Sequence, residues 1–115
     1  MSDWARPVVH WAISARDPEA QRVFYAALFN WDVGDGPIMN IDAGIGGPEP
    51  GPGGHIQQGA PGVVLYVQVR DIHASIARAV ELGGEKQHDP FDPPGGPTIA
   101  FITDPEGNAL TLVQQ

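Results

Sequence analysis

The sequence lacks cysteine altogether and contains few basic residues. The absence of cysteine excludes disulfide bonds, cysteine-ligated zinc, iron–sulfur clusters and a thiol nucleophile. Only 6 lysines and arginines stand against 14 aspartates and glutamates, which gives a formal net charge of −8. Nucleic acids and anionic membrane surfaces are bound by clustered basic side chains, so we expect neither as a partner.

Long apolar stretches are missing as well. No stretch approaches the ~20 apolar residues needed to cross a bilayer, and residues 1–4 show neither the basic nor the apolar region of a signal peptide. We therefore expect a cytoplasmic protein. Hydrophobic residues still make up 42% of the 115 residues, which is enough for the core of one domain.

Glycine and proline divide the chain into two similar halves. They gather at residues 44–62 and 90–97, and both stretches are predicted loops because glycine and proline interrupt regular structure. Residues 63–71 align with residues 9–17, and both segments end in Arg-Asp. The alignment indicates an internal repeat.

Each half begins with a strand-like run that ends at an aspartate suited to cap a helix, Asp17 or Asp71. Apolar residues at helical spacing follow, and the helices are expected to stop at Asn30 and Gly83. Shorter extended pieces come next, at 31–34, 38–43, 55–58, 85–88, 98–103 and 109–114. The pattern predicts one α+β domain over residues 1–115, made of two tandem βαβββ units at about 8–58 and 63–114.

Motifs along the repeat resemble the vicinal-oxygen-chelate superfamily, which contains glyoxalases, bleomycin-resistance proteins and extradiol dioxygenases. They are HWAISARDP at 10–18 with FYAALFNW at 24–31, VQVRD at 67–71 with LGG at 82–84, and FITDPEGN at 101–108 with LTLVQ at 110–114. The resemblance implies a curved mixed sheet with helices on its outer face and a small molecule in its concave face. It implies no particular reaction, because one fold carries many functions.

Side-chain alternation along the strands sorts the residues expected on that concave face. The catalytic candidate is His10, at the start of the first strand. The candidates for substrate binding are Ser14, Asn40, Asp42, His55, Gln57, Val64, Tyr66, Gln68, Ala100, Ile102 and Thr111.

Metal-dependent members of the superfamily draw four ligands from the first and last strands of their two units. Those places hold His10, Gln57, Val64 and Thr111. Only the histidine is a good ligand for a divalent ion, because valine has no donor and neutral oxygens bind weakly. We therefore expect no metal at the usual site. A rearranged divalent-metal site on His10, His55 and Asp42 is the alternative.

The two histidines also have structural interpretations. His10 can be interpreted as a half-buried histidine that is hydrogen-bonded to a neighbour, and equally as a binding residue. His55 borders the glycine-rich loop, where a solvated or lid-like side chain is the simpler expectation.

The sequence leaves three classes of function open. The first is a protein that binds a small organic molecule without the usual metal, for which bleomycin-resistance proteins are the family precedent. The second is an enzyme of lyase, isomerase or cyclase type with His10 as general base, or a metalloenzyme with the rearranged site. The third is a structural or regulatory module. Lactoylglutathione lyase activity is not expected, because its metal-bound enediolate would lack its ligands.

We also expect a homodimer. Members of the superfamily often pair so that units of two chains complete each sheet. Two units alone would leave a sheet edge or face exposed, so the dimer would have two equivalent pockets. The loops at 44–54 and 89–97 are expected to border the pocket mouths.

Overall fold

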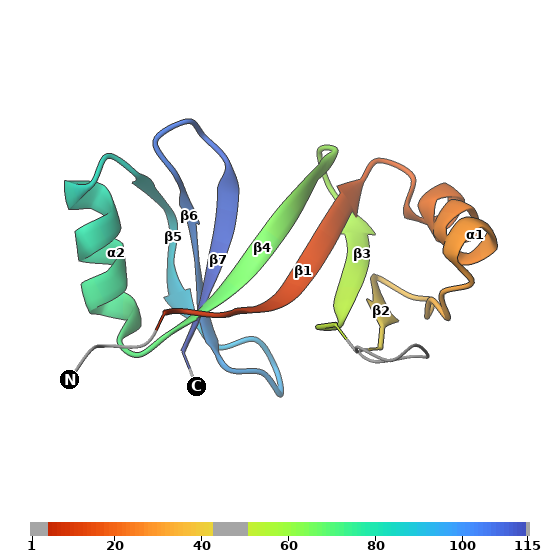
Figure 1. The fold of residues 1–115 in the computed structure, drawn as a ribbon, viewed down its shortest axis with the longest axis horizontal. Helices are drawn as coiled ribbons and strands as arrows, with labels where there is room; N and C mark the ends of the chain where they lie inside the picture. The colour runs from red at the N-terminus through yellow and green to blue at the C-terminus, as the bar shows by residue number, and fades with distance from the viewer. Residues whose placement is uncertain (1–4, 43–50, 115) are drawn as a thin grey trace. The chain divides into compact units, whose positions relative to one another are not determined.

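The computed structural model describes residues 5–42 and 51–114 (Figure 1). The predicted α+β class is confirmed, because each half contains one strand, then one helix, then further strands. Two compact units form: the first unit is His10–Val64, and the second unit contains residues 5–9 and 65–114. Most of the loop at 44–54 lies outside the described residues.

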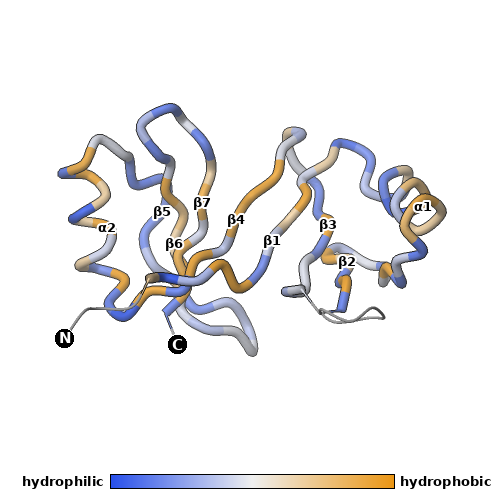
Figure 2. Tube along the Cα trace, viewed as in Figure 1, coloured by the Kyte–Doolittle hydropathy of each residue, from blue (hydrophilic) through white to orange (hydrophobic). Residues whose placement is uncertain are grey.

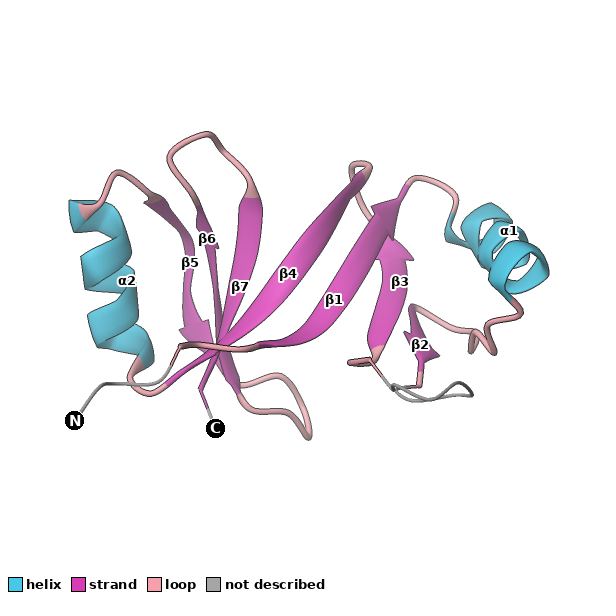
Figure 3. Cartoon of the chain, viewed as in Figure 1, coloured by secondary structure: helices cyan, strands magenta, loops and turns pink. Residues whose placement is uncertain are grey.

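The first unit contains most of β1 (Val8–Ala15), together with α1 (Pro18–Phe29), β2 (Ile38–Ile41) and β3 (Gly54–Gln58). β3 pairs in parallel with β1 and antiparallel with β2. The strand expected at 31–34 is reduced to one bridge between Val33 and Ile41. Figure 3 shows how short β2 is beside β1 and β3.

The second unit contains most of β4 (Gly62–Val69), together with α2 (Ile72–Glu81), β5 (Glu85–Phe91), β6 (Thr98–Thr103) and β7 (Ala109–Gln114). Its strands lie in the order β4-β7-β6-β5. β4 is parallel to β7, whereas β6 is antiparallel to both β7 and β5. None of the helices described over residues 5–42 and 51–114 is long and apolar enough to cross a membrane.

Both helices begin and end where the sequence predicts. Asp17 and Asp71 cap them, because each carboxylate accepts a hydrogen bond from the backbone N–H three residues later. Asn30 follows α1 in the left-handed region, with φ 59°, and Gly83 stands close after α2 with φ 101°. These are the conformations that asparagine and glycine tolerate at the end of a helix.

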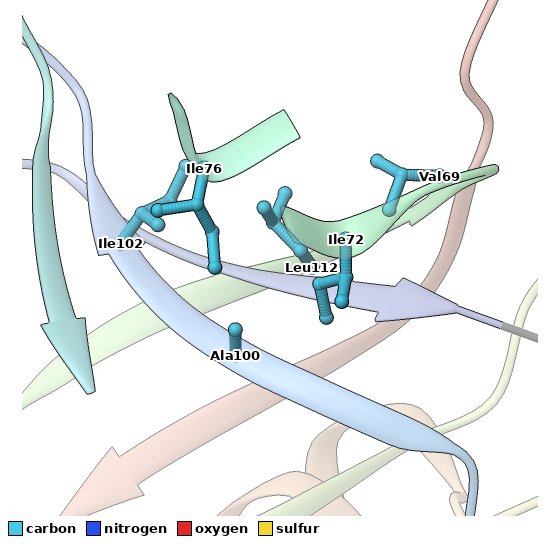
Figure 4. Close-up of a cluster of buried hydrophobic side chains, with 6 residues drawn as sticks. All are labelled: Val69, Ile72, Ile76, Ala100, Ile102 and Leu112. Atoms are coloured by element: carbon cyan, nitrogen blue, oxygen red, sulfur yellow. The ribbon is translucent and has the colours of Figure 1, made fainter. Parts of the chain in front are cut away.

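The core of the second unit lies between α2 and its strands (Figure 4). Side chains from the helix and three strands meet there: Val69, Ile72, Ile76, Ala100, Ile102 and Leu112. The prediction that Ala100 and Ile102 line the ligand-binding face is therefore wrong. Ala100 pairs with Leu112, whereas Phe101 pairs with Thr111 and belongs to the opposite face. A one-residue shift in register exchanges the two faces of a strand.

The first unit packs its apolar side chains less completely. Its buried cluster contains Ala15, Val33, Met39, Ile41 and Ile56, with Trp11, Tyr25 and Trp31 packed against it. No residue of α1 is fully buried, in contrast to α2. Val23, Phe24, Leu28 and Phe29 are 60%, 54%, 59% and 52% exposed. Much of the apolar stripe predicted for this helix is thus open to solvent. Figure 2 shows the apolar residues of α1 in orange.

At Gly54 of the first unit, a side chain would collide with a neighbouring residue. Gly54 stands opposite Trp11 in the β1–β3 pairing, and a Cβ there would lie 2.3 Å from the Trp11 ring. We predict that Gly54→Ala lowers the free energy of unfolding by about 1–3 kcal/mol, because the indole must move. Denaturant titration measures the change. Gly62→Ala, whose Cβ would meet no atom within 4 Å, is the matched control. Equal stabilities of the two variants would contradict the prediction.

Candidate functional site

The strands of the first unit carry polar side chains on the face away from α1. Strand pairing sets Ser14 opposite Gln57 and Asn40 opposite His55. The alternate residues of the same strands, including Ile56 and Met39, pack in the core under α1. The arrangement follows from strand alternation, since neighbouring residues point to opposite faces.

A continuous chain of hydrogen bonds joins four side chains of this face. His10 Nε2 lies 2.8 Å from His55 Nδ1, and His55 Nε2 lies 2.9 Å from Gln57 Oε1. Gln57 Nε2 donates to Ser14 Oγ at 3.1 Å. The two imidazole rings are stacked, with centroids 5.0 Å apart. We call His10, His55, Gln57 and Ser14 the polar chain.

His55 is a buried strand residue, and the expectation of a solvated or lid-like side chain is wrong. It lies within β3 and is only 6% exposed. The glycine-rich stretch before it misled that interpretation, because Gly54 is already the first residue of the strand. The sequence placed His55 near His10 only in the alternative metal site with Asp42, and it did not predict the hydrogen bond between the two rings.

Burial and charge set the protonation of His10. Burial lowers the pKa of His10 below its ordinary value of 6.5, and the nearby positive charge of a protonated His55 lowers it further. Both effects disfavour the imidazolium form. His10 is therefore neutral at neutral pH and able to accept a proton.

The residues that the structure describes do not assemble a set of metal ligands. Within residues 5–42 and 51–114, no three histidine, aspartate or glutamate side chains come together as metal ligands. Asp42 is exposed just after β2, so the predicted alternative set of His10, His55 and Asp42 does not assemble. Both ring nitrogens of His55 are already engaged by His10 and Gln57.

The second unit presents its own polar residues on the face away from α2. Tyr66 pairs with Thr111 and Gln68 with Val113, which sets these side chains on one face together with Phe101. Burial raises the pKa of Tyr66, and its hydrogen bond with Thr111 opposes the rise. Phe101 was missed from the sequence, because the strand was read one residue out of register. Val64 lies in β4 within the first unit and is half-buried.

A cavity of about 410 Å³ opens at the C-terminal end of β1, in the first unit. Ser14, the last member of the polar chain, forms part of its wall. The volume lies in the range of small-molecule sites. The other lining residues are Ile13, Ala15, Arg16, Asp17, Gln21, Tyr25, Pro61, Gly62 and Val63.

Comparison with known proteins supports the resemblance seen in the sequence. Residues 10–113 match the family model described as "Glyoxalase-like domain". The Mycobacterium bovis protein named "Putative glyoxylase CFP32" is 28% identical over 125 aligned residues, which cover 98% of this chain. The chain spans only 48% of the length of that relative.

Solved structures share the fold at low sequence identity. A glyoxalase/bleomycin resistance protein/dioxygenase superfamily member from Vibrio splendidus superposes with a TM-score of 0.67 at 14% identity, covering 96% of this chain and 100% of the other. A variant of Streptomyces coelicolor methylmalonyl-CoA epimerase, in complex with 2-nitronate-propionyl-CoA, gives a TM-score of 0.59 at 19% identity, covering 95% and 94%.

The lowered pKa of His10 predicts a pH effect on stability. The unfolded chain takes up a proton at this residue as the pH falls through about 6.5, whereas the folded chain resists until a lower pH. Stability decreases as the pH decreases wherever the unfolded state binds more protons, so His10 costs stability as the pH falls through that window. His10→Gln should therefore lose less stability than wild type between about pH 7.5 and about pH 5.5.

Thermal unfolding over that range measures the difference between the two proteins. His73→Gln, at an exposed position of α2, is the matched control and should follow the wild-type curve. An identical pH dependence of His10→Gln and wild type would show that burial does not restrain the protonation of His10.

Proposed function

Because the chain belongs to the glyoxalase-like domain family, we propose that it binds a small organic molecule on the polar face of its first unit, without a divalent metal. The observation that carries the proposal is the hydrogen-bonded pair of His10 and His55. The facing nitrogens of the two rings bond to each other, and His55 uses its second nitrogen on Gln57. These bonds engage His10 Nε2 and both ring nitrogens of His55, which supports a site without a divalent metal.

The surroundings of the polar chain suit a ligand of mixed character. Ser14 borders the cavity at the end of β1, whose walls combine apolar side chains such as Ile13 and Val63 with the guanidinium of Arg16. Small-molecule sites are mostly apolar with a few placed polar groups. The S. coelicolor epimerase, which shares the fold, is in complex with a small organic molecule. We propose a site of the same general kind here.

A second candidate function is an enzyme of isomerase or lyase type in which His10 is the general base. The histidine pair favours it, because burial keeps His10 neutral and His55 lies within hydrogen-bond distance to share an accepted proton. A proton acceptor that is neutral near pH 7 meets the basic requirement of general base catalysis. Methylmalonyl-CoA epimerase is an isomerase with the same fold. Its substrate and reaction are not transferred to this chain.

We further propose that the chain pairs with a second copy through the apolar surface of α1. Phe24 and Leu28 are one helical turn apart and more than half exposed, with Val23 beside them. Exposed apolar surface of this kind is typical of an interface. A cytoplasmic location, expected from the sequence, stays a prediction.

The metal-free binding site predicts two linked results. Purified untagged protein should contain no stoichiometric metal by elemental analysis, and Ni²⁺, Zn²⁺, Mn²⁺, Fe²⁺ and Co²⁺ should leave its melting temperature unchanged. A compound from a small-molecule panel that is present at 100 times its Kd should add about 2.7 kcal/mol of stability. This corresponds to a rise in melting temperature of about 10–20 °C for a domain of this size.

The compound's effect should be lost in His10→Ala and kept in the control His73→Ala. Stoichiometric metal that disappears in His10→Ala would contradict the metal-free site. A broad panel without any stabilising compound would contradict the binding function.

The dimer is tested by size-exclusion chromatography with light scattering at tens of micromolar chain. We predict a homodimer for wild type and a monomer for the double variant Phe24→Glu and Leu28→Glu, because two charges would be buried in the contact. Val80→Glu, an exposed apolar position of α2, is the control and should stay dimeric. A monomeric wild type would contradict the proposal.

A further inference from the structure

The cavity at the end of β1 has one basic residue among the described residues of its wall, Arg16. Most of the remaining wall is apolar or aromatic, and it includes Ile13, Ala15, Tyr25, Pro61 and Val63. Small-molecule sites combine an apolar lining with a few placed polar groups that fix the orientation of the ligand. The composition of this wall therefore suits a ligand with an apolar body and one polar group beside the arginine.

Arg16 differs from the other basic residues of the chain because its charge has no partner. The chain has 6 basic residues, and the other five all have interactions within the protein: Arg6, Arg22, Arg70, Arg78 and Lys86. Within residues 5–42 and 51–114, the guanidinium of Arg16 has no ion pair and no hydrogen-bond partner. A chain with 14 carboxylates thus leaves one cation at the cavity wall available to a ligand.

Hydrogen bonds fix the backbone that carries Arg16. Gln58 Nε2 donates to the carbonyl of Arg16 at 2.9 Å, and the N–H of Gly59 donates to the carbonyl of Ala15 at 2.9 Å. Ala15 and Gln58 are also the last partners in the pairing of β1 with β3. The position of Arg16 at the wall is therefore set by the strands, while its exposed side chain can adjust to a ligand.

The charges around the cavity favour a ligand with a single negative charge. Asp17 also lines the cavity, and its carboxylate accepts a hydrogen bond from the N–H of Ala20 at the start of α1. A doubly charged phosphate would bring one more charge than Arg16 balances, close to this carboxylate. A ligand carboxylate brings one charge, and its two oxygens match the paired N–H donors of a guanidinium.

We propose that Arg16 binds the carboxylate of a small apolar carboxylic acid in this cavity. The inference rests on the proposed function, in which a small molecule binds to the first unit, and it adds the class of that molecule. Ser14 belongs both to the cavity wall and to the polar chain. An acid held by Arg16 therefore lies beside the polar chain.

The test compares carboxylic acids with their neutral counterparts. Benzoate, phenylacetate, hexanoate and octanoate are each titrated into the untagged protein by isothermal titration calorimetry, and so are the four corresponding primary amides. At least one acid should bind about tenfold to a hundredfold more tightly than its amide, because only the acid forms charge-assisted hydrogen bonds. Raising the salt concentration from about 0.05 M to about 0.5 M should weaken the acid and leave the amide unchanged.

Substitutions of Arg16 assign the preference to its guanidinium. Arg16→Gln should reduce the affinity for the acid to that for the amide, and the unchanged affinity for the amide shows that the cavity is intact. Arg16→Lys keeps the charge without the paired donors, so its preference for the acid should be intermediate. The matched control is Arg78→Gln, which removes the same charge from an exposed position of α2 and should retain the wild-type preference.

Three results would overturn the proposal: equal affinities of wild type for each acid and its amide, an unchanged affinity for the acid in Arg16→Gln, or tighter binding of phenyl phosphate than of benzoate. Failure of the proposed function is a separate result. Neutral compounds that bind while no acid binds would refute the carboxylate class alone, and no binding of any compound would refute both proposals. An acid that needs Arg16 but binds His10→Ala as tightly as wild type would refute the role of the polar chain alone.

Discussion

The candidate site depends on one contact, the 2.8 Å hydrogen bond between His10 and His55. The parallel pairing of β1 and β3 maintains that contact. It places Ala12 opposite His55 and Ser14 opposite Gln57, so polar side chains from two distant segments share one face. A shift of one residue would turn either set into the core under α1. Trp11 over Gly54 and the buried Ile56 oppose such a shift from the other side of the same strands.

The same contact gives the site its chemical character. Two imidazoles that bond to each other, and then to a carboxamide, use their nitrogens on neighbouring side chains. Burial and mutual repulsion disfavour protonation of His10, which leaves a neutral base in a polar surrounding. Within the glyoxalase-like family, this chain thus combines the shared fold with the polar chain of His10, His55, Gln57 and Ser14. The arrangement is compatible with a binding protein and with a proton-transfer enzyme. Which of the two functions applies depends on whether the bound ligand gives up a proton.

Much of the fold could be predicted from the sequence, because local signals carry it. Asp17, Asp71 and Asn30 bound the helices as expected, and the repeat predicted the strand order along the chain. The errors came from features set by tertiary structure. Which face of the sheet Ala100 and Ile102 occupy depends on the strand register. The local sequence of a short apolar strand does not specify that register. The burial of His55 depends on β1, which lies more than forty residues earlier in the chain. The apolar stripe of α1 has the pattern of a core helix. Its exposure depends on which parts of the protein pack against it, and the stripe alone does not give that information.

We propose that the polar face of the first unit binds a small molecule without a metal, and ¹H–¹⁵N NMR mapping of a small-molecule panel, with a chelator present, is the decisive experiment. We predict that a bound compound shifts the backbone resonances of β1 and β3 around His10, Ser14, His55 and Gln57. Shifts that arise only after a divalent ion is added, or that fall on α2 and spare β1 and β3, would contradict it.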